Sequence, residues 1–130
     1  MNDRPTAREL IDSVRLYLEK ELLPALTDAR LRFQTLVAAN VLSVAGREMA
    51  SEETRLAEEL ALLGEVAAVP TSLEEARKHV RVLNEAWCER IRRGECDDPA
   101  AWRAAAATAR RLVVRKLEVA NPRYLRSITG

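Results

Sequence analysis

The stretch LVAANVLSVAG, residues 36–46, decides the fold class of this chain. Its apolar residues do not form a single stripe at helical spacing; they surround the helix axis almost completely. A helix that is apolar all round is normally covered by other helices on several sides. We therefore expect residues 29–49 to form the central helix of an all-α bundle.

Capping signals and apolar stripes predict four further helices, mostly antiparallel to their neighbours. With the central one, the expected helices cover roughly residues 6–23, 29–49, 52–63, 73–93 and 99–120. The residues expected to cap their N-termini are Thr6, with Glu9 completing a capping box, Ser51, Ser72 and Asp98. Pro24, Gly64, Gly94 and Asn121-Pro122 are expected to end helices, which leaves residues 123–130 as a short tail.

The length of 130 residues fits one domain, residues 1–130, with a core large enough to need no disulfide or structural metal. No apolar run approaches the ~20 residues of a membrane span. The N-terminus is polar and does not resemble a signal peptide. We expect a cytoplasmic protein without a membrane partner, in which Cys88 and Cys96 are reduced thiols.

The sequence offers no set of residues suited to catalysis or metal binding. His79 is the only histidine, and Glu75 lies one turn before it, but a metal site needs more ligands than these two. Cys88 and Cys96 lack CxxC spacing, and Cys88 is expected to be a partly buried small hydrophobe. Glycine-rich phosphate loops are missing. We predict no catalytic residue, no metal and no cofactor, and we expect a protein that is not an enzyme.

Asn40 interrupts the most apolar helix and is the candidate buried polar residue. A buried amide left without hydrogen bonds costs about 1–3 kcal/mol. It therefore either bonds a neighbouring backbone group or buried water, which is the more usual arrangement, or lines a cleft as a binding group.

Charge is unevenly distributed along the chain. Residues 48–75 contain eight acids and one base, whereas residues 103–130 contain seven bases and one acid. These segments are either solvated faces of helices that lie side by side or a basic surface for an acidic partner or a phosphate group. The residues expected to form that surface are Arg110, Arg111, Arg115 and Arg123. Nucleic acid is not expected, because the net charge is only +1 and no aromatic residues alternate with the bases.

Two segments resemble a family of small bacterial helical proteins labelled as a domain of unknown function. The first segment begins with RPTAREL, residues 4–10, and continues through Pro24-Ala25-Leu26 and Phe33 to residues 37–42 and Arg47-Glu48. The second is LEVANPRYL, residues 117–125, while residues 50–115 agree only in helical character. Members accompany aminoglycoside-phosphotransferase-like kinases and acyl-CoA dehydrogenases. One branch is similar to the accessory subunit of a 4-hydroxyacyl-CoA kinase.

The resemblance implies a non-catalytic accessory protein that binds and supports a phosphotransferase-like kinase acting on hydroxyacyl-CoA. It carries over no catalytic residue. Two other classes stay open. One is a stand-alone ligand-binding bundle with a site around Asn40 and His79. The other is a homodimeric structural protein that associates through apolar residues off the main helix stripes, such as Leu16 and Val82.

Overall fold

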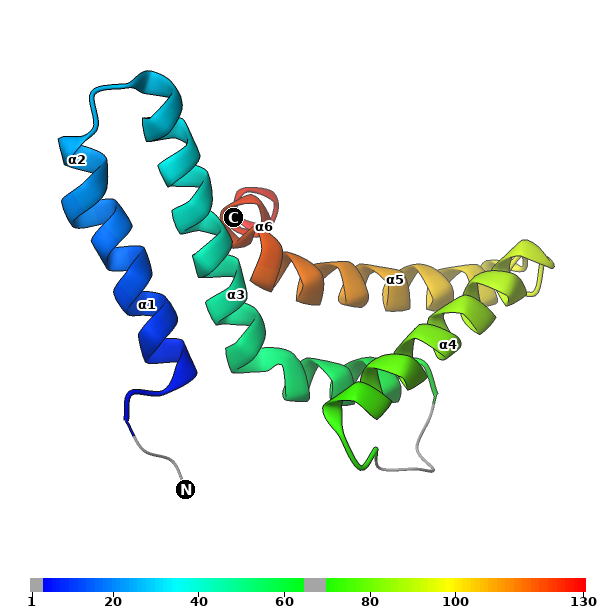
Figure 1. Ribbon diagram of the computed structural model, residues 1–130. Helices are drawn as coiled ribbons and strands as arrows, with labels where there is room; N and C mark the ends of the chain where they lie inside the picture. The colour runs from blue at the N-terminus through cyan, green and yellow to red at the C-terminus, as the bar shows by residue number, and fades with distance from the viewer. Residues whose placement is uncertain (1–3, 65–69) are drawn as a thin grey trace. The chain divides into compact units, whose positions relative to one another are not determined.

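The computed structural model describes residues 4–64 and 70–130. All regular secondary structure in these ranges is helical, which confirms the predicted all-α class (Figure 1). The elements are α1 (Ala7–Tyr17), a π-helical segment η1 (Leu18–Leu22), α2 (Leu23–Ala25), α3 (Ala29–Leu62), α4 (Leu73–Arg92), α5 (Pro99–Ala120) and α6 (Pro122–Thr129).

Contacts between residues divide the chain into two compact units, Met1–Ser51 and Glu52–Gly130. The boundary falls inside α3, so this helix contributes to both units. Each unit is described by itself below, and one domain over residues 1–130 stays a prediction.

The first unit is a hairpin of two helical arms, in which α1 and the first part of α3 run in opposite directions (Figure 1). The predicted capping box starts α1: the Thr6 side chain accepts from the Glu9 N–H at 3.2 Å, and Glu9 accepts from the Thr6 N–H at 2.7 Å. The Arg8 guanidinium donates to the Gly46 carbonyl at 3.0 Å, which ties the two arms together. A Cβ at Gly46 would lie 3.3 Å from Arg8 Nε, so the missing side chain allows this close approach.

The chain remains helical slightly beyond Pro24, where we expected the helix to end. Before Pro24 the helix widens to i→i+5 hydrogen bonding over η1, an arrangement known from helix interruptions. Leu26 is extended and ends α2. The Arg32 guanidinium then donates to the carbonyls of Leu23 and Leu26 at 2.8 and 2.9 Å, and the Leu23 carbonyl also accepts from the Leu26 N–H at 3.3 Å. Asp28 accepts from the Leu31 N–H at 3.0 Å and starts α3.

One continuous helix, α3, replaces the two helices expected over residues 29–49 and 52–63. The prediction failed at Ser51, which does not cap a helix start. Its hydroxyl instead donates to the Arg47 carbonyl at 2.9 Å, one turn back in the same helix. A serine has both options, and only the backbone around it decides between them.

In the second unit, the predicted ends of α4 and α5 are confirmed. Ser72 accepts from the Glu75 N–H at 3.1 Å, and Asp98 accepts from the Ala101 N–H at 3.1 Å. Gly64 and Gly94 have φ values of 89° and 83°, the left-handed conformation that follows many helices. The buried apolar residues of this unit come from α3, α4 and α5. They are Leu60, Ala76, Val80, Leu112 and Val119.

Residues 122–129 form the short helix α6, where we expected a tail without regular structure. Asn121 ends α5 with a non-helical backbone, and its side chain accepts from the Tyr124 N–H at 3.1 Å. Pro122 occupies the first helical position, which suits its fixed φ. Asp98-Pro99 forms the same arrangement at the start of α5, a capping side chain followed by proline at the first helical position.

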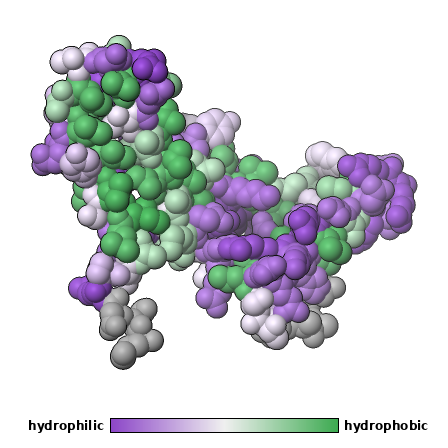
Figure 2. Space-filling view, viewed as in Figure 1, coloured by the Kyte–Doolittle hydropathy of each residue, from purple (hydrophilic) through white to green (hydrophobic). Residues whose placement is uncertain are grey.

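The apolar surface of the first unit is less covered than the sequence indicated. On the described part of α3 up to residue 51, Ala39 is the one buried hydrophobic residue, while Phe33, Leu36, Val37 and Val41 are exposed. Figure 2 shows hydrophobic residues spread over α1 and the first part of α3 on the side turned to the viewer. The first unit places only the α1 arm against α3, and one neighbour cannot cover a helix that is apolar all round.

Candidate functional site

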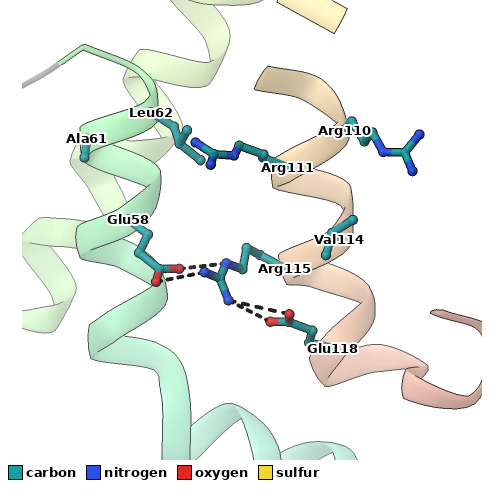
Figure 3. A pocket seen from close by; sticks show the side chains of 8 residues that line it. All are labelled: Glu58, Ala61, Leu62, Arg110, Arg111, Val114, Arg115 and Glu118. Carbon is teal, nitrogen blue, oxygen red and sulfur yellow. Dashed lines mark hydrogen bonds and ion pairs between the residues drawn. The ribbon is translucent and has the colours of Figure 1, made fainter. Parts of the chain in front are cut away.

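The main candidate site lies within the second unit, between the last two turns of α3 and the second half of α5. It is a groove of ≈ 730 Å³, called the arginine groove below. Its lining residues are Glu58, Ala61, Leu62, Arg110, Arg111, Val114, Arg115 and Glu118 (Figure 3). Charged groups therefore border a floor that includes small and apolar side chains.

Arg115 is held by two carboxylates and is not a free cation. Its Nε lies 2.9 Å from Glu58 Oε2, and its Nη2 donates to Glu58 Oε1 at 3.1 Å. Its Nη1 also lies 3.2 Å from Glu118 Oε2. Of the two contacts with Glu58, the one from Nη2 to Oε1 is a hydrogen bond, and the one from Nε to Oε2 is a close ion pair without hydrogen-bond geometry. Arg115 thus fastens α5 to α3, which corrects its assignment to a surface that awaits a partner.

Arg110 and Arg111 carry the unneutralised positive charge of the groove. Both are exposed, and neither has an ion pair or hydrogen bond in the described part of the chain. In Figure 3, Arg111 extends toward Leu62 across the groove, while Arg110 points away from α3. The predicted basic surface is therefore reduced to two arginines at this groove.

Arg123, the fourth predicted arginine, does not line the groove. It lies in α6 and is exposed. The alternative interpretation of the charge pattern is confirmed at one point, because Glu58 of the acidic segment does lie beside Arg115 of the basic segment. Glu58 and Glu118 were not singled out as site residues, although the opposite charges of their segments contained the signal.

A second groove, of ≈ 510 Å³, lies in the same unit. Its lining residues are Glu59, Arg77, Val80, Arg81, Asn84, Glu85, Cys88, Arg92 and Lys116. Glu59 is the one buried charged residue in the described ranges, with 8% of its surface exposed. Four basic side chains and the acid Glu85 share the groove with it, and two of the bases, Arg77 and Arg92, pair with other carboxylates.

Two acidic residues, Glu52 of α3 and Glu75 in the first turn of α4, have lowered pKa values. The Arg77 guanidinium donates a hydrogen bond to Glu52 and holds the pKa of that carboxyl below its usual value, although partial burial opposes the shift. The Thr71 hydroxyl and N–H donate to Glu75 at 2.6 and 2.7 Å and lower the pKa of Glu75, with a smaller contribution from His79. The first contact is an ion pair that joins α3 to α4, and the second is a pair of hydrogen bonds from a neutral residue at the start of α4.

Several predicted single residues have other surroundings than expected. Asn40 is exposed, so its amide reaches water and needs neither an internal partner nor a cleft. The prediction of burial failed because the flanking helix surface is itself uncovered. Cys88 is exposed and Cys96 half-buried, and both are free thiols, so the expected partial burial of Cys88 was wrong. His79 is half-buried.

Within residues 4–64 and 70–130, no group of three or more His, Cys, Asp or Glu side chains is arranged to hold a metal ion. In the same ranges, no helix has both the length and the apolar character required to cross a membrane. The fold and the grooves thus define an all-α protein whose described sites are built from charge pairs between helices.

Comparison with protein-family models matches residues 24–124 to a family described as Domain of unknown function (DUF6285). The match extends over most of the chain, so the chain belongs to this family. It includes residues 50–115, where the sequence resemblance was expected in helical character only. Neither a curated protein nor a solved structure matches the chain.

Proposed function

We propose that this protein is a non-catalytic accessory protein that binds and supports a phosphotransferase-like kinase acting on hydroxyacyl-CoA. The kinase as partner comes from the family resemblance. The observation that carries the binding role is the arginine groove. Arg110 and Arg111 form no ion pair or hydrogen bond with the described residues, and they lie next to apolar groups of α3 and α5. A protein segment with carboxylates suits such a groove.

The chemistry of the groove supports an acidic protein segment in particular. Arginine binds carboxylates through two parallel N–H donors, which fixes the orientation of the bound group. Ala61, Leu62 and Val114 add apolar contact area next to these donors. Arg115 is already neutralised by Glu58 and Glu118, so it keeps the groove in shape while the other two arginines meet the partner.

Titration calorimetry with the purified kinase tests this proposal. The wild-type chain is expected to bind, and the double variant Arg110→Glu/Arg111→Glu is expected to bind at least about tenfold more weakly, because each lost charge-assisted contact is worth ~1.5 kcal/mol or more. The matched control is Arg103→Glu/Arg126→Glu. It changes the net charge equally at exposed positions that do not line the groove.

Kinase activity and thermal stability, measured with and without this protein, give the second readout. An accessory protein raises at least one of them, and the groove variant loses that effect while the control keeps it. Absence of both binding and any effect on the kinase would refute the accessory role. Equal loss of binding in the groove and control variants would reduce the contact to general electrostatic attraction.

A further inference from the structure

The apolar side of the first unit has a regular pattern on α1. Leu10, Val14 and Tyr17 are 54%, 52% and 56% exposed. Their spacing of four and three residues places them on one face of the helix. The residues that turn toward α3 are different ones, Ile11 and Leu18, which are half-buried. A second apolar stripe on α1 that is exposed requires a further packing partner, which this unit does not contain.

The first part of α3 carries a matching pattern. Leu31, Ala38, Leu42, Ala45 and Met49 follow heptad spacing along one side of the helix. Leu31 and Met49 are exposed at the two ends of this row. At 100° per residue, this row and the α1 stripe lie on the same side of the hairpin, and Figure 2 shows hydrophobic residues over both helices on one side. Together these eight residues are called the apolar face.

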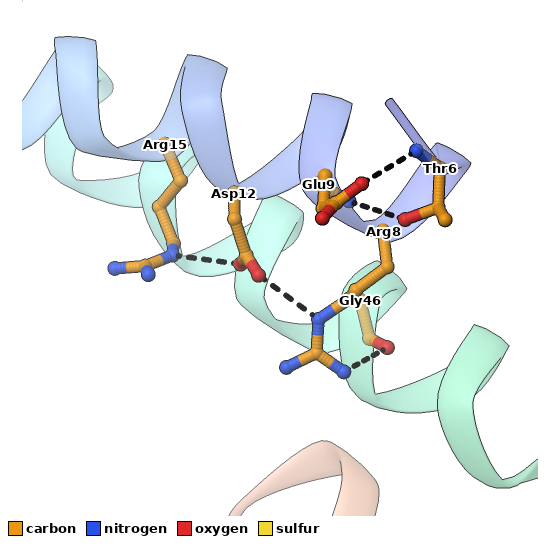
Figure 4. A network of polar contacts seen from close by, with 6 residues as sticks. All are labelled: Thr6, Arg8, Glu9, Asp12, Arg15 and Gly46. Carbon is orange, nitrogen blue, oxygen red and sulfur yellow. Dashed lines mark hydrogen bonds and ion pairs between the residues drawn. The ribbon is translucent and has the colours of Figure 1, made fainter. Parts of the chain in front are cut away.

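Charged groups lie on the other side of α1. Arg8, Asp12, Arg15 and Glu19 repeat at helical spacing and pair with one another, and Figure 4 shows the contacts of Asp12 with Arg8 and Arg15. The separations are 3.1 Å for Arg8–Asp12, 3.6 Å for Arg15–Asp12 and 3.0 Å for Arg15–Glu19. The charges of α1 are therefore paired among themselves, whereas the apolar face on the other side lacks cover. Phe33, Leu36, Val37 and Val41 of α3 are exposed as well but do not belong to this face.

We infer that a second copy of this chain covers the apolar face, so that two hairpins associate as a four-helix bundle. The heptad row on α3 and the shorter apolar stripe beside it on α1 call for helical neighbours, and a second hairpin supplies two helices with the same pattern. Residues 4–51 contain seven basic and six acidic residues, so this unit offers no net charge that would select an oppositely charged partner. A balanced surface is compatible with its own copy.

The apolar face has the size of a weak, transient contact. The α1 stripe lies within residues 10–17, about 12 Å of helix, and the α3 row within residues 31–49, about 28 Å. At a width of about 10 Å for each helix this gives roughly 400 Å² for each copy, or about 800 Å² in total, below the ~1,000 Å² of a stable interface. We therefore expect a dimer that forms at high concentration and dissociates on dilution.

The side chains of the two helices are complementary in size. The α1 stripe has Leu, Val and Tyr, whereas the α3 row has alanines between its larger residues. A two-fold axis brings the same patch of both copies together, so α1 of one copy can cross α3 of the other. Large side chains then pack against alanines, which permits close helix contact without changes in either backbone.

Sedimentation equilibrium of the full chain over a wide concentration range tests this inference. The wild type is expected to approach twice the chain mass at high concentration. Val14→Glu and Ala38→Glu are each expected to weaken the dimer at least about a hundredfold, because two-fold symmetry buries the new carboxylate twice. Circular dichroism checks that the variants remain helical.

Ser13→Glu is the matched control, since Ser13 is exposed on the same helix but points away from both α3 and the apolar face. It should dimerise like the wild type, as should the groove variant Arg110→Glu/Arg111→Glu. Hydrogen exchange of the wild type at low and high concentration gives a readout that needs no variant. Protection should increase in residues 10–17 and 31–49.

A wild-type chain that stays monomeric at all concentrations would overturn the inference and mean that the apolar face is covered within the chain. Dimers that persist in both Val14→Glu and Ala38→Glu would also overturn it, since association would then use another surface. If either variant fails to fold, concentration-dependent protection decides: protection confined to residues 52–130, or no change, contradicts the inference.

Discussion

At the scale of single residues, this chain uses arginine in two different ways. Arg115 is fixed by Glu58 and Glu118, whereas Arg110 and Arg111 have no such contacts in the described residues. The sequence predicted a group of equivalent cations because it shows charge and spacing. It does not show which carboxylate lies opposite each guanidinium. That information appears only when α3 and α5 are side by side.

This difference predicts different effects on folding stability. Arg115→Ala should lower the free energy of unfolding by about 1 kcal/mol, because an ion pair between half-exposed groups is lost. Arg110→Ala should change it by less than about 0.5 kcal/mol, as is usual for an exposed residue without contacts. Urea denaturation of both variants measures the two values, and equal effects would contradict the assigned roles.

The lowered pKa of Glu52 predicts a dependence of stability on acidity. The carboxylate is favoured in the folded state, so its contribution is fully present above the pKa of the unfolded chain, about 4.3. It is lost as the pH falls through the lower pKa of the folded state. Glu52→Gln, which keeps the shape but not the charge, should therefore reduce the loss of stability between neutral pH and about pH 3. An unchanged loss in urea titrations at the two pH values would argue against the Arg77 contact.

At the scale of elements, helix ends were predictable where the signal is local. Thr6, Ser72 and Asp98 cap helices as expected because each forms its hydrogen bond within three residues. Ser51 failed because a serine can equally bond the preceding turn, and the surrounding helix decides which occurs. Asn121-Pro122 contained the signal for α6, but it was interpreted only as the end of α5.

Gly94 provides a test of the turn that follows α4. Its φ of +83° is unfavourable for other residues, and a Cβ there would lie 2.8 Å from Asp97 Oδ2. Gly94→Ala is therefore expected to destabilise the fold by about 1–2 kcal/mol. Gly94→Asn should cost less, because asparagine tolerates this conformation better. Thermal unfolding of both variants would contradict this interpretation if asparagine were the more harmful substitution.

At the scale of the whole molecule, the sequence predicted the all-α class but not which helix faces are covered. The stretch 36–46 predicted a helix with neighbours on several sides, whereas the first unit supplies one arm against it and leaves Leu36, Val37 and Val41 exposed. Asn40 was expected to be buried for the same reason and is exposed. The spacing of apolar residues predicts which helix surface is buried against a neighbour, but it does not predict which element or chain that neighbour is. This surface and the arginine groove are therefore the two places where we expect other protein chains to bind.

Hydrogen exchange of the full chain, with and without the purified phosphotransferase-like kinase, is the most direct test of the proposed accessory role. The chain concentration should be one at which its oligomeric state does not change, so that any change in protection is due to the kinase. The arginine groove predicts that amide protection increases in residues 58–62 and 110–118 when the kinase is added. No increase at saturating kinase, or an increase restricted to residues 10–49, would contradict binding through the arginine groove.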